Sequence, residues 1–494
     1  MGKRSPGMQL VGANILSLVT IGMYQNPLAI YREYLQNSSD AVAASEVGGR
    51  VDIEIDPSSR GIRIRDDGPG LPQSEAARAL VAVGDSSKTR GVDRGFRGIG
   101  RLSGLAFAES VTFRTRCRGR KRITQVVWNG GTLREKVLEG ATVKSILEEC
   151  VDITTAPGDC FPEHFFEVEV SGVSRHAAGQ LLNMDAVRAY VAEVCPVPLS
   201  SAFPFSGTVD NFLASHGRGF SLEVGVNGVD LPLQRLDHAS IAFSETVSDA
   251  FVELETFEVA SISGDRVAAV GWLAHSGYRG AIPRSLGVRG LRARAGDIQV
   301  GGENVFDHLF PEERFNRWCV GEVHVLDPRI SPNGYRTYFE PGAHTRNLEN
   351  HLTAVARRVA GRCRQNSSVR HAGRRVAARV ERANQALGPA RRLVSSDKAA
   401  LEFVQRVVAA EEVSVRRARE EALQLGDGHL DSIEELSAIE ASLSLVKEKL
   451  QEKAPTSGRR RSRDGERWRI AFEQLADACD SPEMALRALE GAFC

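Results

Sequence analysis

The sequence predicts an α+β protein in which two regions of mixed helices and strands precede a helical region. Residues 1–200 mix helical spacing and strand alternation with many glycines, and residues 201–345 contain several strand-like runs. Residues 346–453 carry almost no strand signal. Alternation with period two is typical of half-buried strands, whereas apolar residues three and four apart are typical of helices.

The composition is that of an ordinary folded chain. Its 494 residues allow three domains at roughly 100–200 residues each. The 63 Lys and Arg residues balance 63 Asp and Glu residues, which argues against a globally basic nucleic-acid-binding protein. No apolar run reaches the length of about 18 residues that a membrane span needs. The eight cysteines are scattered without a Cys-x-x-Cys pair, so we expect a cytoplasmic protein without a zinc site or disulfide framework.

The first region should open with helices and a β-hairpin. Residues 15–44 have helical spacing that is interrupted at Asn26-Pro27. Residues 51–55 and 62–65 alternate with period two around a Pro-Ser-Ser-Arg-Gly turn, which predicts the hairpin. Further strands are expected at residues 111–116, 165–170, 220–226, 251–259, 266–274 and 322–326.

The helical region should contain several separate helices. We expect breaks near Gly388-Pro389 and Gly426-Asp-Gly428, because glycine and proline end helices. Residues 454–465 have the composition of a linker, and residues 466–494 are expected to form a C-terminal helix.

The first motif that carries chemistry is Glu33-Tyr-Leu-Gln-Asn37-Ser-Ser-Asp40. Helical positions i, i+4 and i+7 share a face, so Glu33, Asn37 and Asp40 should point toward one site. A carboxylate there can orient or deprotonate a water molecule. The amide oxygen of Asn37 is a hard ligand suited to Mg²⁺. The alternative is a solvated polar stripe, which is common on helices.

The second motif is Asp66-Asp-Gly68-Pro-Gly70-Leu71, directly after a predicted strand. Its two glycines permit a sharp turn and a close approach of a ligand to the backbone. The carboxylate of Asp66 can accept a hydrogen bond from an exocyclic amine such as that of adenine. The alternative is an ordinary Asp-Gly turn.

The third motif is Gly95-Phe-Arg-Gly98-Ile99-Gly100, followed by helical sequence. A glycine-rich backbone at a helix start presents N–H groups and a positive dipole end to phosphate. The motif lacks the Gly-Lys-Ser/Thr of a Walker A loop, and no strand leads straight into it. Lys88 lies upstream in a polar loop that could close over phosphates, or it is a solvated cation.

Together, the three motifs in this order resemble the Bergerat-fold ATPases of the GHKL group. That group includes gyrase-type topoisomerases, heat-shock chaperones, histidine kinases, and MutL and MORC proteins. The resemblance implies an ATP-binding α/β sandwich with Glu33 as general base, Asn37 as Mg²⁺ ligand and Asp66 on the adenine amine. It implies support of the adenine side through water by Asp40. The implied ATP-binding residues are Asn37, Asp40, Asp66, Gly68, Gly70, Leu71, Lys88, Gly98, Ile99 and Gly100.

A second resemblance covers the run Gly321-Glu-Val-His-Val-Leu-Asp-Pro-Arg-Ile-Ser-Pro-Asn-Gly-Tyr-Arg-Thr-Tyr-Phe-Glu340. It is similar to a middle-domain segment of bacterial relatives of the 90-kDa heat-shock chaperone, and it implies a ribosomal-protein-like α/β middle domain. By this register Arg336 reaches the γ-phosphate as a catalytic residue, with Arg329 as the nearby competitor. The alternative for Arg336 is a surface ion pair. A threonine-bearing strand follows the lid in this group, and neither Thr142 nor the strand at Phe165 matches it well.

The charge of the helical region is segregated. Residues 357–392 contain eleven arginines and one acid, whereas residues 397–452 contain thirteen acids and seven bases. The arginines could neutralise nucleic-acid phosphates. Alternatively they pair with acidic helices of the same bundle or of a dimer partner, which the scarcity of aromatic residues favours.

The resemblance implies a magnesium-dependent, ATP-hydrolysing homodimeric clamp that remodels a protein client. The runner-up interpretation is a MORC- or MutL-like ATPase that acts on nucleic acid through residues 357–392. A third is an adaptor that binds ATP and barely hydrolyses it.

Overall fold

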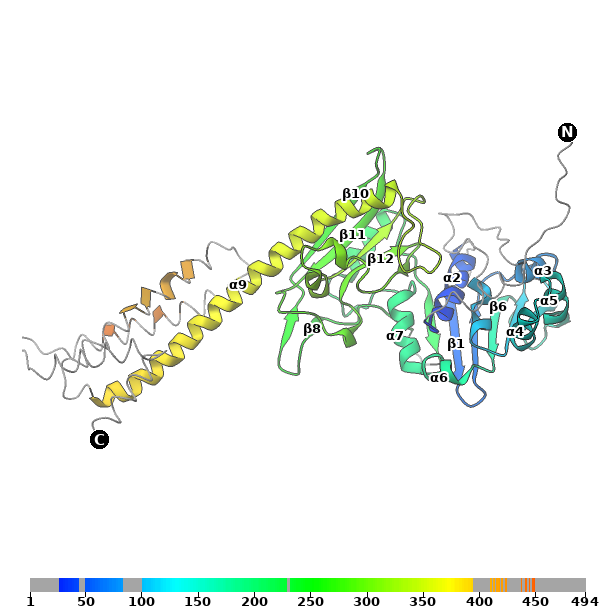
Figure 1. Cartoon of the computed structure of the whole chain (residues 1–494), viewed down its shortest axis with the longest axis horizontal. Coiled ribbons are helices and arrows are strands. Elements are labelled where there is room, and N and C mark those ends of the chain that lie inside the picture. The colour runs from blue at the N-terminus through cyan, green and yellow to red at the C-terminus, as the bar shows by residue number, and fades with distance from the viewer. Residues whose placement is uncertain are drawn as a thin grey trace, which may run out of the picture. The chain divides into compact units, whose positions relative to one another are not determined.

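The computed structural model describes residues 26–43, 49–82, 100–228 and 232–393, together with short helical stretches between 409 and 448. The chain divides into two compact units, Met1–Cys363 and Arg364–Cys494. Sheets and helices alternate in the first unit, and the described part of the second unit is helical (Figure 1). The predicted α+β class is therefore confirmed, while the exact domain boundaries and the ribosomal-protein-like middle fold stay predictions.

A seven-stranded sheet organises the N-terminal part of the first unit. Its strand order is β5-β4-β3-β6-β2-β1-β7. Neighbouring strands are antiparallel except for β1 and β7. The predicted hairpin is present as β1 and β2, whereas β7 joins this sheet from beyond residue 200. The strands are β1 Arg50–Asp56, β2 Gly61–Asp66, β3 Ser110–Arg116, β4 Arg122–Asn129, β5 Val151–Pro157, β6 Phe165–Ser171 and β7 Glu223–Val226.

Helices cover one face of this sheet because alternate strand residues are apolar. Ile53, Ile64 and Val168 are buried in one cluster with Ile30 and Leu35 of the first helix. The opposite face carries charges, such as Arg65 and Arg114 on either side of Glu167. The helical segments are α2 Ala29–Ala43, α3 Gln73–Val81, η1 Gly100–Ala106, α4 Gly130–Leu138, α5 Val143–Cys150, α6 Arg175–Leu181 and α7 Met184–Val194.

Two tyrosines hold α2 in place. The Tyr31 hydroxyl donates to the Leu181 carbonyl at 2.7 Å, at the end of α6. The Tyr34 hydroxyl accepts from the backbone N–H of Gly104 in η1 at 3.0 Å. A Cβ on Gly104 would lie 2.5 Å from that hydroxyl, so η1 can approach α2 only with glycine there. The predicted helix is confirmed from Ala29 onward, and residues 15–25 lie outside the described residues.

A five-stranded sheet organises the middle of the chain, with the order β10-β11-β14-β12-β13. Strands β12 and β14 are parallel, and the other pairs are antiparallel. The sequence did not predict β12, because Arg292 and Arg294 alternate in it and charged residues are rarely buried. The elements are α8 Ser206–Ser215, β8 Ser240–Ala242, β9 Ser248–Ala250, β10 Glu253–Ala260, β11 Val267–His275, η2 Arg284–Leu286, β12 Gly290–Ala295, β13 Ile298–Val300, η3 Asp307–Leu309, η4 Glu313–Trp318 and β14 Val320–Val325.

One 51-residue helix, α9 Ala343–Leu393, follows the second sheet. Apolar residues three and four apart bury its first turns in the core of that sheet, including Leu348, Leu352 and Val355. The predicted break near Gly388-Pro389 is wrong, because α9 continues to Leu393. Pro389 removes one backbone donor from the helix. The helix tolerates this because only four helical residues follow Pro389. Among the described helices, none combines the length and hydropathy needed to cross a membrane.

The helical region uses its charges in pairs. Arg358 and Arg362 of α9 each lie 2.6 Å from a glutamate of β10, Glu255 and Glu253. In the second unit, Glu412 pairs with Lys447 at 2.6 Å and Arg419 pairs with Glu440 at 2.9 Å. The partner numbers run in opposite directions, so these two helical stretches are antiparallel. The predicted break near residue 426, the linker and the C-terminal helix lie outside the described residues.

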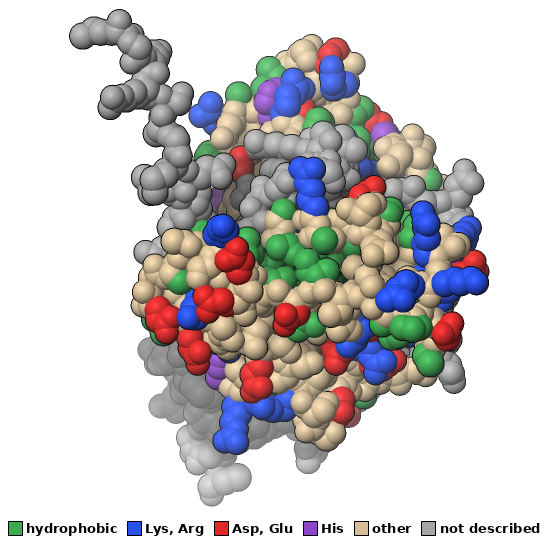
Figure 2. Space-filling view, turned by 90° about the vertical axis from the view of Figure 1, so that its right-hand side faces the viewer, with side chains coloured by type: hydrophobic (Ala, Val, Ile, Leu, Met, Phe, Trp, Pro, Cys, Tyr) green, Lys and Arg blue, Asp and Glu red, His purple; other side chains and the backbone are tan. Residues whose placement is uncertain are grey.

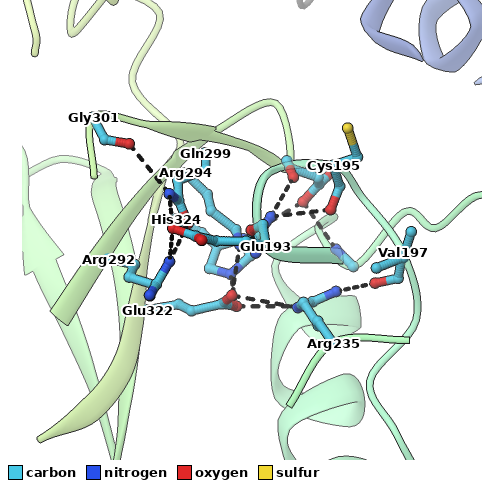
Figure 3. Close-up of polar contacts among 12 residues, drawn as sticks. Glu193, Cys195, Val197, Arg235, Arg292, Arg294, Gln299, Gly301, Glu322 and His324 are labelled. Carbon is cyan, nitrogen blue, oxygen red and sulfur yellow. Dashed lines mark hydrogen bonds and ion pairs between the residues drawn. The ribbon is translucent and has the colours of Figure 1, made fainter. Parts of the chain in front are cut away.

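A buried cluster of charged side chains joins α7 to the second sheet (Figure 3). Arg292 Nη1 donates to Glu193 Oε1 at 2.5 Å, and Arg294 Nε donates to Glu322 Oε1 at 2.6 Å. Arg235 lies 3.3 Å from the same Glu322 carboxylate, which is 4% exposed. Burial alone would raise the pKa of Glu322, but Arg235 and Arg294 hold it well below the usual range. Buried arginines in β12 are thus neutralised by acids from α7 and β14.

Replacing Glu322 by glutamine should lower the free energy of unfolding by about 3–5 kcal/mol, because Arg235 and Arg294 would remain buried without their counter-charge. The contribution of Glu322 is present at neutral pH and is lost as the pH falls through its lowered folded-state pKa. Urea denaturation at pH 7 measures the change. Glu54→Gln is the matched control, because Glu54 pairs with Arg63 at the surface at 2.8 Å and should cost less than about 1 kcal/mol. Equal small losses in both variants would contradict the expectation.

Candidate functional site

A stripe of three residues along α2 is only partly covered. Glu33, Asn37 and Ala41 are half-buried and four residues apart, so they follow one line along the helix. At one end, a Cβ on Gly100 would lie 2.2 Å from Glu33 Oε2. At the other end, a Cβ on Gly68 would lie 3.7 Å from the Cβ of Ala41. The second and third motifs therefore lie at opposite ends of one stripe. Its ends, Glu33 and Ala41, are about 12 Å apart along the helix axis at a rise of 1.5 Å per residue.

The carboxylate of Glu33 is held by the residue next to it. Arg32 Nη2 donates to Glu33 Oε1 at 2.9 Å, and Arg32 Nε donates to the same oxygen at 3.3 Å. Both side chains are mostly covered, at 12% and 13% exposure. The sequence did not single out Arg32, because consecutive helical residues rarely face each other. The pairing fixes Oε1 and leaves Oε2 next to Gly100.

Asp66, the last residue of β2, is tied to α2. Its Oδ2 accepts from Ser38 Oγ at 2.7 Å, and its Oδ1 accepts from the Gly68 N–H at 3.1 Å. The residue is 2% exposed, and burial raises the pKa of its carboxyl to about 6. Its neighbour Asp67 has a different task, because it accepts from the N–H of Gly49 at 2.8 Å at the start of β1. The sequence did not single out Ser38, because the helical spacing favoured Asn37 and Asp40 on either side of it.

The glycine turn after Asp66 is fixed against the ends of β3 and β6. Gly70 has φ +68°, and a Cβ on it would lie 2.0 Å from the carbonyl oxygen of Arg116. The Leu71 N–H donates to Thr115 Oγ1 at 2.7 Å, and that hydroxyl donates to the Phe165 carbonyl at 3.1 Å. This turn is therefore a built feature that joins three strands, beyond what an ordinary Asp-Gly turn requires.

Replacing Gly70 by alanine should destabilise the protein by more than about 2 kcal/mol, because the positive φ and the clash with Arg116 add together. Gly119→Ala is the matched control. Gly119 has φ +75° and nothing within 4 Å of its Cβ position, so that variant carries the backbone cost of about 1 kcal/mol alone. Thermal unfolding of the two variants measures the difference. Equal shifts in Tm would show that the contact with Arg116 does not constrain the turn.

The residue that faces Asp66 from the neighbouring strand is Phe166. Directly paired residues of antiparallel strands point to the same side of a sheet, so Phe166 lies beside Asp66 on the helix-covered face. Thr142 is elsewhere, as the exposed N-cap of α5 that accepts from the Ser145 N–H. The strand beside Asp66 therefore presents an aromatic side chain at the paired position.

The remaining predicted residues fall into two classes. Asp40 is 9% exposed on α2, and Gly100 opens the 3-10 helix η1 rather than an α-helix. Lys88, Gly98 and Ile99 lie outside the described residues.

Arg336 lies in the loop between β14 and α9. It has φ +54°, and its carbonyl accepts from the Gly301 N–H at 2.8 Å. Its competitor Arg329 is held by Asp327 at 2.8 and 2.7 Å. Among the described residues, no hydrogen bond joins Arg336 to Glu33. The roles assigned to individual site residues stay predictions.

The residues present fit a magnesium ion that takes most of its ligands from phosphate and water. No group of three or more His, Cys, Asp or Glu residues that could hold a metal occurs in the described part of the chain. Mg²⁺ is commonly held by one or two protein oxygens and substrate phosphates, so a single amide oxygen in mid-stripe suits it. Asn37 occupies that position between Glu33 and Ala41.

Comparisons with known proteins give a family model that matches the part of the chain carrying α2 and the turn after Asp66. Residues 28–153 match the family model "Histidine kinase-, DNA gyrase B-, and HSP90-like ATPase". The DNA mismatch repair protein MutL of Shewanella sp. (strain ANA-3) is 30% identical over 156 residues, which are 30% of this chain and 23% of that protein. The chaperone protein HtpG of Acinetobacter baylyi is 28% identical over 222 residues, 35% of this chain and 35% of that protein. The chain thus matches only a minor part of the length of these relatives.

Proposed function

We propose that this chain binds ATP with Mg²⁺ along α2 and hydrolyses it, because residues 28–153 match the model of the GHKL-type ATPases and parts of the chain match the MutL and HtpG relatives. The stripe formed by Glu33, Asn37 and Ala41 carries the proposal. It is bounded by the buried carboxylate of Asp66 at one end and by Gly100 at the other. A nucleoside triphosphate has this polarity, with a hydrogen-bonding base at one end and phosphates at the other.

Each residue of the stripe has a task in this proposal. Asp66 accepts a hydrogen bond from the adenine amine, and Asp40 supports the same side through water. Asn37 binds the magnesium ion, which when bound neutralises phosphate charge. Glu33, oriented by Arg32, aligns and deprotonates the attacking water.

The parts of the phosphate end follow from the group resemblance. Lys88, Gly98 and Ile99 close over the phosphates together with Gly100. Arg336 stabilises the charge that develops on the γ-phosphate, as arginines do in phosphoryl transfer.

Calorimetric titration of the full chain with ATP, combined with phosphate release in the presence and absence of EDTA, tests the proposal. We expect saturable binding and slow release that EDTA abolishes. Glu33→Ala, purified in parallel, shows whether a contaminating ATPase is the source of the phosphate. Binding without release would establish the nucleotide-gated adaptor instead, and no binding would refute the proposal.

We further propose that the chain works as a homodimeric clamp on a protein client. Support comes from the HtpG relative, which is named a chaperone, and from the long helix α9 with the antiparallel helical stretches of the second unit. Light scattering after size exclusion, with and without a non-hydrolysable ATP analogue, tests this step. A particle of one-chain mass in both conditions would exclude the clamp.

The second candidate function is action on nucleic acid, which the MutL relatives and the arginines of residues 357–392 favour. One observation weakens it. Arg358 and Arg362 are already paired with Glu255 and Glu253. On the side of the molecule that Figure 2 shows, Lys and Arg side chains are mixed with Asp and Glu, so this side adds no basic patch of its own.

A salt-titrated DNA-binding assay of the full chain and of the Arg374→Ser, Arg375→Ser double variant decides between the two candidates. Phosphate contacts predict binding that weakens steeply with salt and weakens further in the variant. No salt-dependent binding by the full chain would remove this candidate.

A further inference from the structure

Packing and hydrogen bonds link α2 to the loop that carries Arg336, and the first step is α7. This helix packs against both α2 and β13. Tyr190 of α7 is partly buried, and burial raises the pKa of its hydroxyl.

The second step crosses from α7 to the second sheet (Figure 3). Glu193 Oε1 accepts from Gln299 Nε2 at 3.2 Å as well as from Arg292. Gln299 is 2% exposed, and its Oε1 accepts from Arg292 Nη1 at 3.0 Å. The Gln299 amide is therefore held on both sides, and its orientation depends on Glu193 and Arg292.

The third step reaches the backbone of Arg336. Gln299 Nε2 also donates to the Gly301 carbonyl at 3.2 Å, and the Gly301 N–H donates to the Arg336 carbonyl at 2.8 Å. A Cβ on Gly301 would lie 2.7 Å from the Thr337 carbonyl, so the two backbones touch. Arg336 has a positive φ, a conformation that a non-glycine residue keeps only when its surroundings impose it. Gly301 is such a constraint.

We propose that Glu193 and Gln299 are positioning residues that place the Arg336 loop according to the state of α2. This inference rests on the proposed ATPase function. The position of Glu193 depends on α2, because α7 packs against α2. Gln299 donates hydrogen bonds to both Glu193 and Gly301, so a shift of Glu193 also shifts Gly301. Arg336 then reaches the γ-phosphate only when α2, α7 and β13 hold their closed arrangement.

Steady-state ATP turnover and ATP binding of four variants of the full chain test the relay. Gln299→Met and Glu193→Ala should lower kcat about tenfold with ATP affinity unchanged, because each removes hydrogen bonds of the relay. Glu193→Gln should recover much of the loss, since its amide oxygen still accepts from Gln299. Arg358→Gln cuts the ion pair with Glu255 at the other edge of the same sheet and should leave kcat unchanged.

Two further measurements separate positioning from general destabilisation. In an Arg336→Ala background, Gln299→Met should cause no additional loss of kcat, whereas a structural defect would add to it. Backbone amide exchange at Gly301 and in residues 333–337 should rise in Gln299→Met.

Unchanged kcat and unchanged exchange in Gln299→Met, in a protein that hydrolyses ATP, would overturn the relay alone. If the wild-type chain does not hydrolyse ATP, the proposed function fails. Increased exchange would then still support the structural link to the loop, and unchanged exchange would refute it.

Discussion

Replacing Glu33 by alanine should leave ATP binding within about threefold of wild type and lower turnover by at least about 100-fold. The reason is the position of Glu33 at one end of the α2 stripe, next to Gly100 and at the opposite end from the turn that follows Asp66. Removing its carboxylate takes away the proposed general base. It leaves the proposed adenine contacts at the Asp66 end in place. It also removes the negative charge that Arg32 pairs with.

Glu33→Gln is the more stringent variant. Its amide oxygen can still accept from Arg32, so the local geometry is kept, but the amide cannot take a proton from water. Isothermal titration calorimetry should give a Kd close to wild type, and a phosphate-release assay should give no turnover above background. Turnover by Glu33→Gln at the wild-type rate would mean that another group activates the water.

The local placement of the candidate site residues could be predicted because it is encoded in short spacings. The four-residue step from Glu33 to Asn37 placed them on one helix face, and the alternation of residues 62–65 placed Asp66 at the end of a strand. Local rules of this kind need no knowledge of distant segments.

Other features depend on neighbours that are distant in sequence. Ser38 reaches Asp66 only because α2 packs on β2, and Phe166 faces Asp66 only through the register of β6. The strand β12 was missed because its arginines are neutralised by Glu193 and Glu322, about 100 and 30 residues away. A helical pattern likewise does not reveal that a proline close to a helix end is tolerated, as in α9.

Replacing Asp66 by asparagine should abolish measurable ATP binding while leaving the protein at least as stable at pH 7. Burial raises the pKa of this carboxyl from 3.8 to about 6, so its ionised form is disfavoured in the folded protein. Because the pKa is higher in the folded than in the unfolded protein, the contribution of Asp66 to the free energy of unfolding is full below about pH 4. This contribution is lost as the pH rises through about 6. At neutral pH the ionised carboxylate lowers the free energy of unfolding by about 3 kcal/mol, at 1.36 kcal/mol per pKa unit. Asparagine carries no charge and does not have this cost.

The wild-type carboxylate should also give ATP affinity a pH dependence. Protonation below about pH 6 places a hydrogen on one of its oxygens, both of which already accept from Ser38 and Gly68. Affinity should therefore fall several-fold as the pH falls from 7 to 5, as measured by titration calorimetry with the ionisation of ATP itself subtracted.

The adjacent acid provides the control that separates binding from folding. Asp67 accepts from the backbone N–H groups of Gly49 and Arg50 at the start of β1, so Asp67→Asn should lower Tm and keep ATP binding. Asp66→Asn should do the reverse. Two neighbouring carboxylates with opposite effects on affinity and Tm would show that β2 ends in one acid that binds and one that holds the turn. If both variants bind ATP like wild type, the base is not held by this motif.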